Sequence, residues 1–207
     1  SKVLRDWASP DLVEKFLERT KKGELIGCMA LSEPGVGSDP TVIQTRAIRQ
    51  GDHWVINGRK TWIANGHISD YCILFAQTDP SKGRFGIQAI LVDRRESPYE
   101  SRDIKTIGLR GFPCSELSFE DCKVPLKNTL ATWLVESSEK GKQPMAEASS
   151  VIDMLVGQVI LFPLLGWALV SVGLARRAFD TTLDYVKVRK QFGKEIGRFQ
   201  LIQEMIV

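Results

Sequence analysis

The sequence predicts an α+β chain of more than one domain, with a short N-terminal helix, a central antiparallel β-barrel or sandwich, and a C-terminal helical bundle. Three observations support this prediction. Apolar residues recur at helical spacing near the start, short β-branched and aromatic runs fill the middle, and long helical patterns fill the end. Strands followed by helices are typical of α+β proteins. We expect domains at residues 1–23, 24–133 and 134–207.

The first predicted element is an amphipathic helix over residues 10–23, "PDLVEKFLERTKKG". Its apolar side chains recur at helical spacing, at Leu12, Val13, Phe16 and Leu17. Basic residues followed by Gly23 mark its end, as is typical of a helix C-terminus.

The pattern of the middle region, from Glu24 to about Val124, predicts strands. Its runs include "ELIGCMALSE", "YCILFAQTD" and "FGIQAILVDRR", and Gly, Asn, Asp and Pro separate them. Gly51-Asp52 predicts a hairpin, and Asn57-Gly58 predicts a second turn. Five or more strands with no helix between them favour an antiparallel sandwich or small barrel.

The last region returns to helical patterns over residues 151–188 and 198–207, with "RKQFGKEIG" between them. The polar stretch 136–150, "ESSEKGKQPMAEASS", predicts a surface loop or a disordered insertion. Residues 154–175 contain no charged side chain. Such a stretch fits either a membrane span or a helix buried within a bundle. The β-rich region before it and the lack of a second span favour the buried helix.

Composition narrows the class of protein. With 43% hydrophobic and 26% charged residues among 207, the chain is typical of a soluble globular protein. A net charge of +3 is too small to indicate nucleic-acid binding. The cysteines lie far apart, and the chain has only two histidines, so neither a metal site nor a disulfide framework is expected. These residues are Cys28, Cys72, Cys114, Cys122, His53 and His67. A reducing intracellular compartment fits this cysteine use.

The stretch "MALSEPGVGSD", residues 29–39, leaves a strand through a flexible polar turn. One interpretation is an ordinary tight turn. The other is that Gly35, Gly37 and Ser38 clear a space where backbone N–H groups meet an anionic ligand. The stretch alone does not decide between them.

Four motifs, in this order along the chain, resemble the acyl-CoA dehydrogenase family of flavoproteins. They are "MALSEPGVGSD" with "WVINGRKTWIANG", "IKTIGLRGFPCSELSFEDCKVP", "GLARRAFDTTLDY", and "YVKVRKQFGKEIGRFQLIQ". The resemblance runs from about residue 10 to the end. It implies an FAD enzyme of lipid metabolism with an N-terminal helical domain, a central β-domain and a C-terminal helical bundle. This chain would then hold the end of the first domain, the whole β-domain and the start of an incomplete bundle.

The resemblance also implies roles for individual residues. Ser32 would contact the polar edge of the flavin ring, Trp62 would pack on the ring, and Arg189 would reach the FAD pyrophosphate of a neighbouring subunit. Ser38 would lie near the phosphopantetheine arm of the acyl-CoA substrate. The cofactor-binding positions implied are Met29, Leu31, Ser32, Gly37, Ser38, Trp62, Ile63, Ala64, Arg189, Gln191, Phe192, Phe199 and Gln200.

The sequence departs from the family pattern at Ala64 and in the helix around residues 161–164. Ala64 stands where the family usually carries Thr or Ser, whose hydroxyl bonds to flavin N5. The carboxylate base lies beyond Val207 in most members and near Pro163 in a minority, and no acidic residue occurs there. The family's CoA-side Arg and Asp align with Leu164 and Leu161. The catalytic residue is therefore unknown, and the given chain alone is expected to be inactive.

Three functions follow as expectations. The first is FAD-dependent α,β-dehydrogenation of an acyl-CoA, in a homodimer or homotetramer that passes electrons to an electron-transferring flavoprotein. The second is an acyl-CoA oxidase or flavin monooxygenase on the same scaffold. The third is a non-catalytic flavin-binding or interaction protein with possible membrane association. Cytoplasm, mitochondrion and peroxisome are not distinguished.

Overall fold

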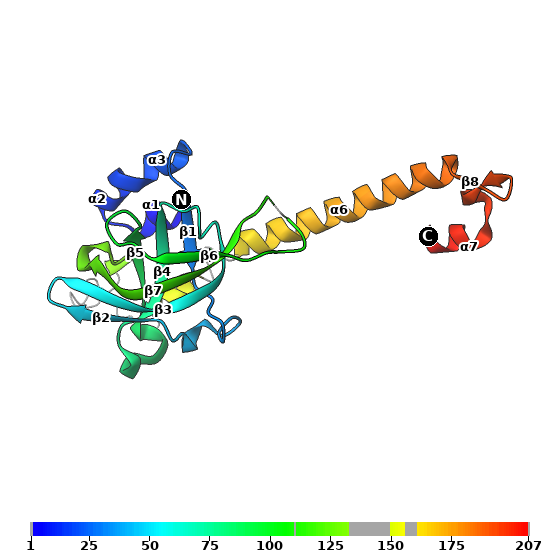
Figure 1. The fold of residues 1–207 in the computed structure, drawn as a ribbon. Helices are drawn as coiled ribbons and strands as arrows, with labels where there is room; N and C mark the ends of the chain where they lie inside the picture. The colour runs from blue at the N-terminus through cyan, green and yellow to red at the C-terminus, as the bar shows by residue number, and fades with distance from the viewer. Residues whose placement is uncertain (1, 110, 133–149, 156–160, 207) are drawn as a thin grey trace. The chain divides into compact units, whose positions relative to one another are not determined.

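A computed structural model describes residues 2–109, 111–132, 150–155 and 161–206 (Figure 1). The chain divides into two packed units, Ser1–Val156 and Gly157–Val207. Most of the polar stretch 136–150 and the predicted boundary at 133/134 lie outside the described residues. The predicted domain boundaries therefore stay predictions.

The first unit opens with short helical segments. They are α1 (Lys2–Trp7), α2 (Pro10–Leu12), the π-helical turn η1 (Val13–Leu17) and α3 (Glu18–Lys21). The last three run without a break, as the pattern over 10–23 predicts. The sequence prediction missed α1. Phe16 packs on Tyr71 with 5.1 Å between ring centroids, so these helices cover one face of the sheet.

Seven strands form the sheet of the first unit (Figure 1). They are β1 (Gly27–Ala30), β2 (Arg46–Gln50), β3 (His53–Ala64), β4 (Tyr71–Gln77), β5 (Ile87–Asp93), β6 (Glu100–Asp103) and β7 (Cys114–Pro125). Their order is β1-β4-β2-β3-β7-β6, and β5 pairs with β4. Short 3₁₀ turns lie between or after strands: η2 (Pro40–Val42), η3 (Pro80–Gly86) and η4 (Leu126–Asn128).

The predicted antiparallel sheet is confirmed for the pairs β2–β3, β3–β7, β4–β5 and β6–β7. The sheet is nevertheless mixed, because β1 runs parallel to β4 and one further parallel bridge joins β2 to β4. No local signal marks β1–β4 pairing, since more than 40 residues separate Gly27 from Tyr71, its partner in register.

The two turn signals of this region have different outcomes. Gly51-Asp52 forms the predicted two-residue hairpin, with Gln50 opposite His53. The turn predicted at Asn57-Gly58 is wrong, because β3 continues through it. The pairing with β7 shifts register between Ile56 and Gly58, where Asn57 of β3 lies opposite Glu120 and Asp121 of β7. The irregularity is therefore a bulge in β7 and not a turn in β3.

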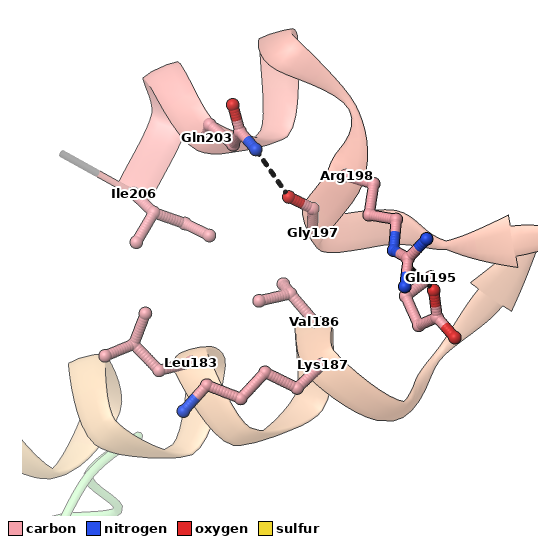
Figure 2. A pocket seen from close by; sticks show the side chains of 8 residues that line it. All are labelled: Leu183, Val186, Lys187, Glu195, Gly197, Arg198, Gln203 and Ile206. Carbon is pink, nitrogen blue, oxygen red and sulfur yellow. Dashed lines mark hydrogen bonds and ion pairs between the residues drawn. The ribbon is translucent and has the colours of Figure 1, made fainter.

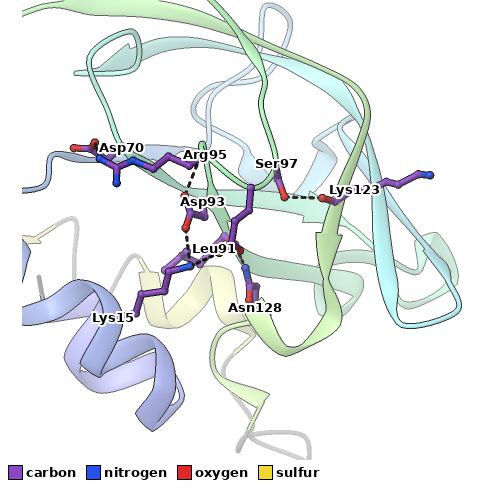
Figure 3. A network of polar contacts seen from close by, with 9 residues as sticks. Lys15, Asp70, Leu91, Asp93, Arg95, Ser97, Lys123 and Asn128 are labelled. Carbon is purple, nitrogen blue, oxygen red and sulfur yellow. Dashed lines mark hydrogen bonds and ion pairs between the residues drawn. The ribbon is translucent and has the colours of Figure 1, made fainter.

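Polar contacts fasten the N-terminal helices to the end of β5 (Figure 3). Lys15 lies 2.8 Å from the carboxylate of Asp93, which is nearly buried. The same carboxylate accepts a hydrogen bond from the Arg95 backbone N–H at 3.0 Å, and the Arg95 guanidinium pairs with Asp70 at 3.6 Å. Asn128 donates to the Leu91 carbonyl at 3.0 Å. These contacts fix the side of the sheet that carries β4 and β5.

The first unit ends with α5 (Val151–Leu155), which packs against β5. The second unit contains α6 (Leu161–Val188), a hairpin of β8 (Lys190–Gln191) and β9 (Lys194–Glu195), the 3₁₀ turn η7 (Ile196–Arg198), and α7 (Gln200–Ile206). The hairpin lies where "RKQFGKEIG" predicts a break between helices.

The apolar stretch 154–175 lies partly outside the described residues. Among those described, no helix is long and apolar enough to cross a membrane. Leu169, Val172 and Leu174 on α6 are exposed. The expected burial on all sides is therefore not found among the described residues, where α6 contacts η7, β9 and α7 of its own unit.

Candidate functional site

The first candidate site is a ridge made by the end of β1 and the end of β3. The Thr61 backbone N–H donates to the Ser32 carbonyl at 2.9 Å, so the turn after β1 runs beside β3. Met29 is exposed, and Leu31 and Ser32 are half-buried. We call Met29–Ser32 together with Trp62 the contact ridge. The structure thus brings together two motifs that lie some 30 residues apart.

Trp62 is presented by a β-bulge. The pairing of β3 with β7 passes from Lys60–Leu117 to Ile63–Ser115, so Thr61 and Trp62 oppose one residue. Trp62 has a φ of 60°, a left-handed conformation that is strained for a non-glycine residue. Its side chain is 64% exposed. Bulges re-aim side chains beside functional sites, and this one turns a large aromatic ring away from the core.

The two residues after Trp62 offer no polar side chain to a ligand. The Ile63 side chain is 2% exposed and belongs to the core, so only its backbone could reach a ligand. Ala64 is half-buried and pairs with Cys114 of β7. It offers no side-chain donor.

The glycine-rich turn after β1 is closed by reciprocal backbone bonds. The Glu33 N–H donates to the Val36 carbonyl at 2.8 Å, and the Val36 N–H donates to the Glu33 carbonyl at 3.1 Å. A Cβ added at Gly35 or Gly37 would meet no atom within 4 Å, and Ser38 is exposed. No crowding by the described chain requires glycine there, which leaves these positions open to a ligand.

A buried ion pair, which the sequence analysis missed, underlies the contact ridge. Lys60 Nζ lies 2.9 Å from Glu33 Oε1, and their side chains are 0% and 4% exposed. Lys60 Nζ also donates to the Leu31 carbonyl at 2.9 Å. The Glu33 carboxylate accepts from the backbone N–H groups of Gln44 at 2.6 Å and Thr45 at 2.9 Å. A lysine in a strand is ordinarily solvent-exposed, so the sequence carries no signal for this burial.

The Glu33 carboxyl is held in its ionised form. Burial favours the neutral acid, but hydrogen bonds from Thr45 and Gln44 and the charge of Lys60 outweigh it, so the pKa of Glu33 lies below its ordinary value. A depressed carboxyl pKa stabilises the fold above the ordinary value of 4.5, and this contribution is lost as the pH falls through the lower folded-state pKa.

We therefore expect acid to weaken the first unit partly through Glu33. The free energy of unfolding of the wild type falls between about pH 6 and pH 3, and the variant that combines Glu33→Gln with Lys60→Met, which leaves neither charge buried, loses less over the same range. Urea denaturation at several pH values measures both slopes. Equal slopes would contradict the assigned role of Glu33, since the other carboxyls are common to both proteins.

The second candidate site lies in the second unit, on the β8–β9 hairpin. Phe192 and Gly193 have φ values of 52° and 81°, as a type I′ turn requires. Phe192 at the tip is 92% exposed, and its ring lies 6.1 Å from that of Phe199, edge to face. Gln191 and Gln200 are exposed nearby in the chain. The structure thus gathers the predicted Phe192 and Phe199 around one hairpin.

Arg189 joins α6 to this hairpin. Its backbone N–H donates to the Tyr185 carbonyl at 2.9 Å, and its carbonyl accepts from Ile196 N–H at 2.8 Å. Its side chain is exposed, and no carboxylate of the described residues pairs with it. A fixed backbone and an unpaired guanidinium suit a phosphate ligand.

A hollow in the second unit is separate from the hairpin site (Figure 2). It has a volume of about 530 Å³ and lies between the end of α6, η7 and α7. Gln203 donates to the Gly197 carbonyl at 2.9 Å across one end. The residues around it are Leu183, Val186, Lys187, Glu195, Gly197, Arg198, Gln203 and Ile206. None of the predicted cofactor residues belongs to it, so we do not assign it to the site.

The described residues contain no group of three or more His, Cys, Asp or Glu that could hold a metal ion. Of the residues implied for the CoA side, Leu164 is exposed, and the side chains of Leu161 and Pro163 lie outside the described part.

Two family models match the chain. The model of the acyl-CoA dehydrogenase middle domain matches residues 28–122, and that of the acyl-CoA dehydrogenase C-terminal domain matches residues 165–207. The first match covers the contact ridge, and the second covers the hairpin.

Known proteins resemble the chain over nearly its whole length. Cyclohex-1-ene-1-carbonyl-CoA dehydrogenase of Syntrophus aciditrophicus is 38% identical over 200 residues, 96% of this chain and 44% of that protein. Caffeyl-CoA reductase-Etf complex subunit CarC of Acetobacterium woodii is 38% identical over 195 residues, 94% of this chain and 47% of that protein. The chain spans about half the length of these curated relatives.

A solved structure supports the same relationship. The glutaryl-CoA dehydrogenase of Mycobacterium smegmatis in complex with FADH2 superposes with a TM-score of 0.79 at 28% identity. The match covers 99% of this chain and 48% of that one. The similarity therefore extends through both units.

Proposed function

The chain belongs to the acyl-CoA dehydrogenase family of oxidoreductases, and we propose that the whole protein removes hydrogen from the α and β carbons of an acyl-CoA thioester with FAD as its cofactor. The observation that carries the proposal is the contact ridge. It presents the exposed Trp62 indole beside the half-buried residues Leu31 and Ser32, in the region that matches the family's middle domain.

The residues present fit FAD. Trp62 offers a broad apolar ring face, and the bulge that holds its backbone at a positive φ leaves the side chain exposed. The turn at Gly35 and Gly37 leaves open space, and Arg189 offers a pyrophosphate an exposed guanidinium that pairs with no carboxylate of the described residues. When bound, FAD supplies the acceptor for the hydride of the substrate β-carbon.

The chain's own residues would bind, orient and exclude water. The Trp62 ring would cover one side of the flavin, and the Ser32 hydroxyl and backbone would donate to its polar edge. Ser38 would lie near the phosphopantetheine arm of the thioester. Arg189 would hold the pyrophosphate of a neighbouring subunit, with Gln191, Phe192, Phe199 and Gln200 beside the adenosine half. No residue of the chain is proposed as the general base, which we expect beyond Val207.

The proposed partners follow from the family and the relatives. A homodimer or homotetramer would bring Arg189 to a neighbour's cofactor. An electron-transferring flavoprotein is the proposed acceptor, supported by a relative whose name places it in an Etf complex. A reducing intracellular compartment is proposed because Cys28 and Cys72 are free thiols although they face each other in register on β1 and β4.

An oxidase on the same scaffold is the second candidate, and Ala64 favours it. A hydroxyl that family members usually aim at flavin N5 is replaced by a methyl group. The lost hydrogen bond is worth about 1 kcal/mol.

The proposal is tested with the visible absorption spectrum of the purified full-length protein, before and after anaerobic addition of several acyl-CoA thioesters. We expect a flavin band that one thioester class bleaches. Slow return of colour in air supports the dehydrogenase, and rapid return supports the oxidase. A flavin band that no thioester bleaches would contradict both.

We expect the Trp62→Ala variant to weaken FAD binding about tenfold, because aromatic packing contributes ~0.5–1.5 kcal/mol beyond the area it buries. Its melting temperature changes little, because the indole is mostly exposed in the chain alone. Titration of the apoprotein with FAD measures the effect. Ile48→Ala, at an exposed apolar residue of β2, is the control. An equal loss of affinity in both variants would refute the assignment of Trp62.

A further inference from the structure

The Lys60–Glu33 ion pair is buried, where removing charges from water costs free energy. Lys60 is among the largest fully buried side chains of the described chain. Its charge is matched by one carboxylate and one carbonyl, those of Glu33 and Leu31, each at 2.9 Å. A lysine removed from water in this way must be held by good geometry.

The pair connects the two segments of the contact ridge. Lys60 stands two residues before Trp62, at the start of the bulge, and donates to the backbone of Leu31. Glu33 stands one residue after Ser32 and binds the backbone of Gln44 and Thr45. The bond from Thr61 N–H to the Ser32 carbonyl lies between these anchors. Movement of either charged group would therefore change the spacing between Leu31–Ser32 and Trp62.

Stability alone does not account for the pair. Burial lowers the pKa of Lys60 below its ordinary value, and the attraction of Glu33 offsets this only in part. The folded state thus disfavours the charged lysine even beside its partner. Apolar side chains of similar volume often stabilise a core as well as or better than a buried ion pair.

We propose that Lys60 and Glu33 are positioning residues for FAD, which fix the spacing between the Leu31–Ser32 turn and the bulge that carries Trp62. The proposal rests on the proposed function, since it assumes that the contact ridge receives the flavin. Neither residue touches the cofactor. They hold the backbone that does.

The test uses the full-length protein with Lys60→Met and Glu33→Gln combined. The combination removes the clamp on the Leu31 carbonyl without leaving an unpaired buried charge. Leu4→Ala is the matched control, because Leu4 is 1% exposed on α1, a helix that belongs to neither segment of the contact ridge. It lowers the melting temperature by a core defect outside the ridge.

Two quantities are measured, the dissociation constant of FAD from the apoprotein and the reduction potential of the bound flavin. We expect the double variant to bind FAD about tenfold more weakly, with a shifted potential. The Leu4→Ala variant is expected to bind within about twofold of the wild type, with its potential unchanged.

The outcomes separate the two proposals. If the wild type fails to bind FAD, the proposed function fails and this inference fails with it. If the wild type binds FAD and the double variant keeps its affinity and potential, the positioning role is overturned while the proposed function stands. A double variant that does not fold, or a control with the same loss of affinity, would also overturn it, because the pair would then serve stability alone.

Discussion

The Lys60→Met variant is expected to lower the free energy of unfolding by about 3–5 kcal/mol, the usual cost of removing one partner of a buried ion pair. Glu33 would keep a carboxylate with 4% exposure and no cation beside it, and the Leu31 carbonyl would lose its donor. The loss is a large share of a typical domain stability of about 5–15 kcal/mol, so the protein is expected to fold with a lower melting temperature. Chemical denaturation at neutral pH measures it.

A double-mutant cycle controls this prediction. Adding Glu33→Gln to Lys60→Met removes the unpaired charge, and the amide oxygen can still accept from a backbone N–H of Gln44 or Thr45. The double variant is therefore expected to be more stable than Lys60→Met alone. Additive losses would contradict the ion pair as the source of the effect.

The second large effect is expected at Gly58, where an alanine should cost about 2–4 kcal/mol. A Cβ there would lie 2.7 Å from the Cα of Thr45, and φ is +152°. Overpacking costs about 1–3 kcal/mol, and an unfavourable backbone conformation adds a similar amount. Truncating Thr45 does not relieve the clash, since its own backbone is the obstacle. Chemical denaturation of Gly58→Ala measures the loss.

Gly51→Ala separates the two causes. Gly51 also has a positive φ, +61°, but an added Cβ would meet no atom within 4 Å. Backbone strain alone is expected to cost about 1–2 kcal/mol. If Gly51→Ala and Gly58→Ala are equally destabilised, the close approach of β3 to Thr45 is not what requires the glycine at 58.

Local patterns predicted the elements of the fold that depend on local physics. The hairpin at Gly51-Asp52 follows from turn chemistry, and the break after α6 follows from the loss of helical periodicity at "RKQFGKEIG". The parallel pairing of β1 with β4 was not predictable in this way, because it joins distant segments. Asn57-Gly58 misled the prediction, since β3 continues through this dipeptide and the irregularity beside it is a bulge of β7.

The candidate site likewise contains residues that the sequence indicated and residues that it did not. The resemblance of the motifs indicated Trp62 and Arg189 as cofactor contacts, and the structure shows both side chains exposed within their own units. Their cofactor contacts stay predictions. The Lys60–Glu33 ion pair could not be predicted from the sequence, because only the tertiary fold shows that this lysine is buried against a carboxylate. The inward side chain of Ile63 was likewise set by the bulge register.

The most direct test of the central claim is a crystal structure of the full-length protein with FAD bound. We expect the flavin ring to contact the Trp62 indole and the backbone of Leu31–Ser32, with the Lys60–Glu33 pair unchanged behind them. A flavin bound elsewhere, with Trp62 still exposed to solvent, would contradict the assignment of the contact ridge.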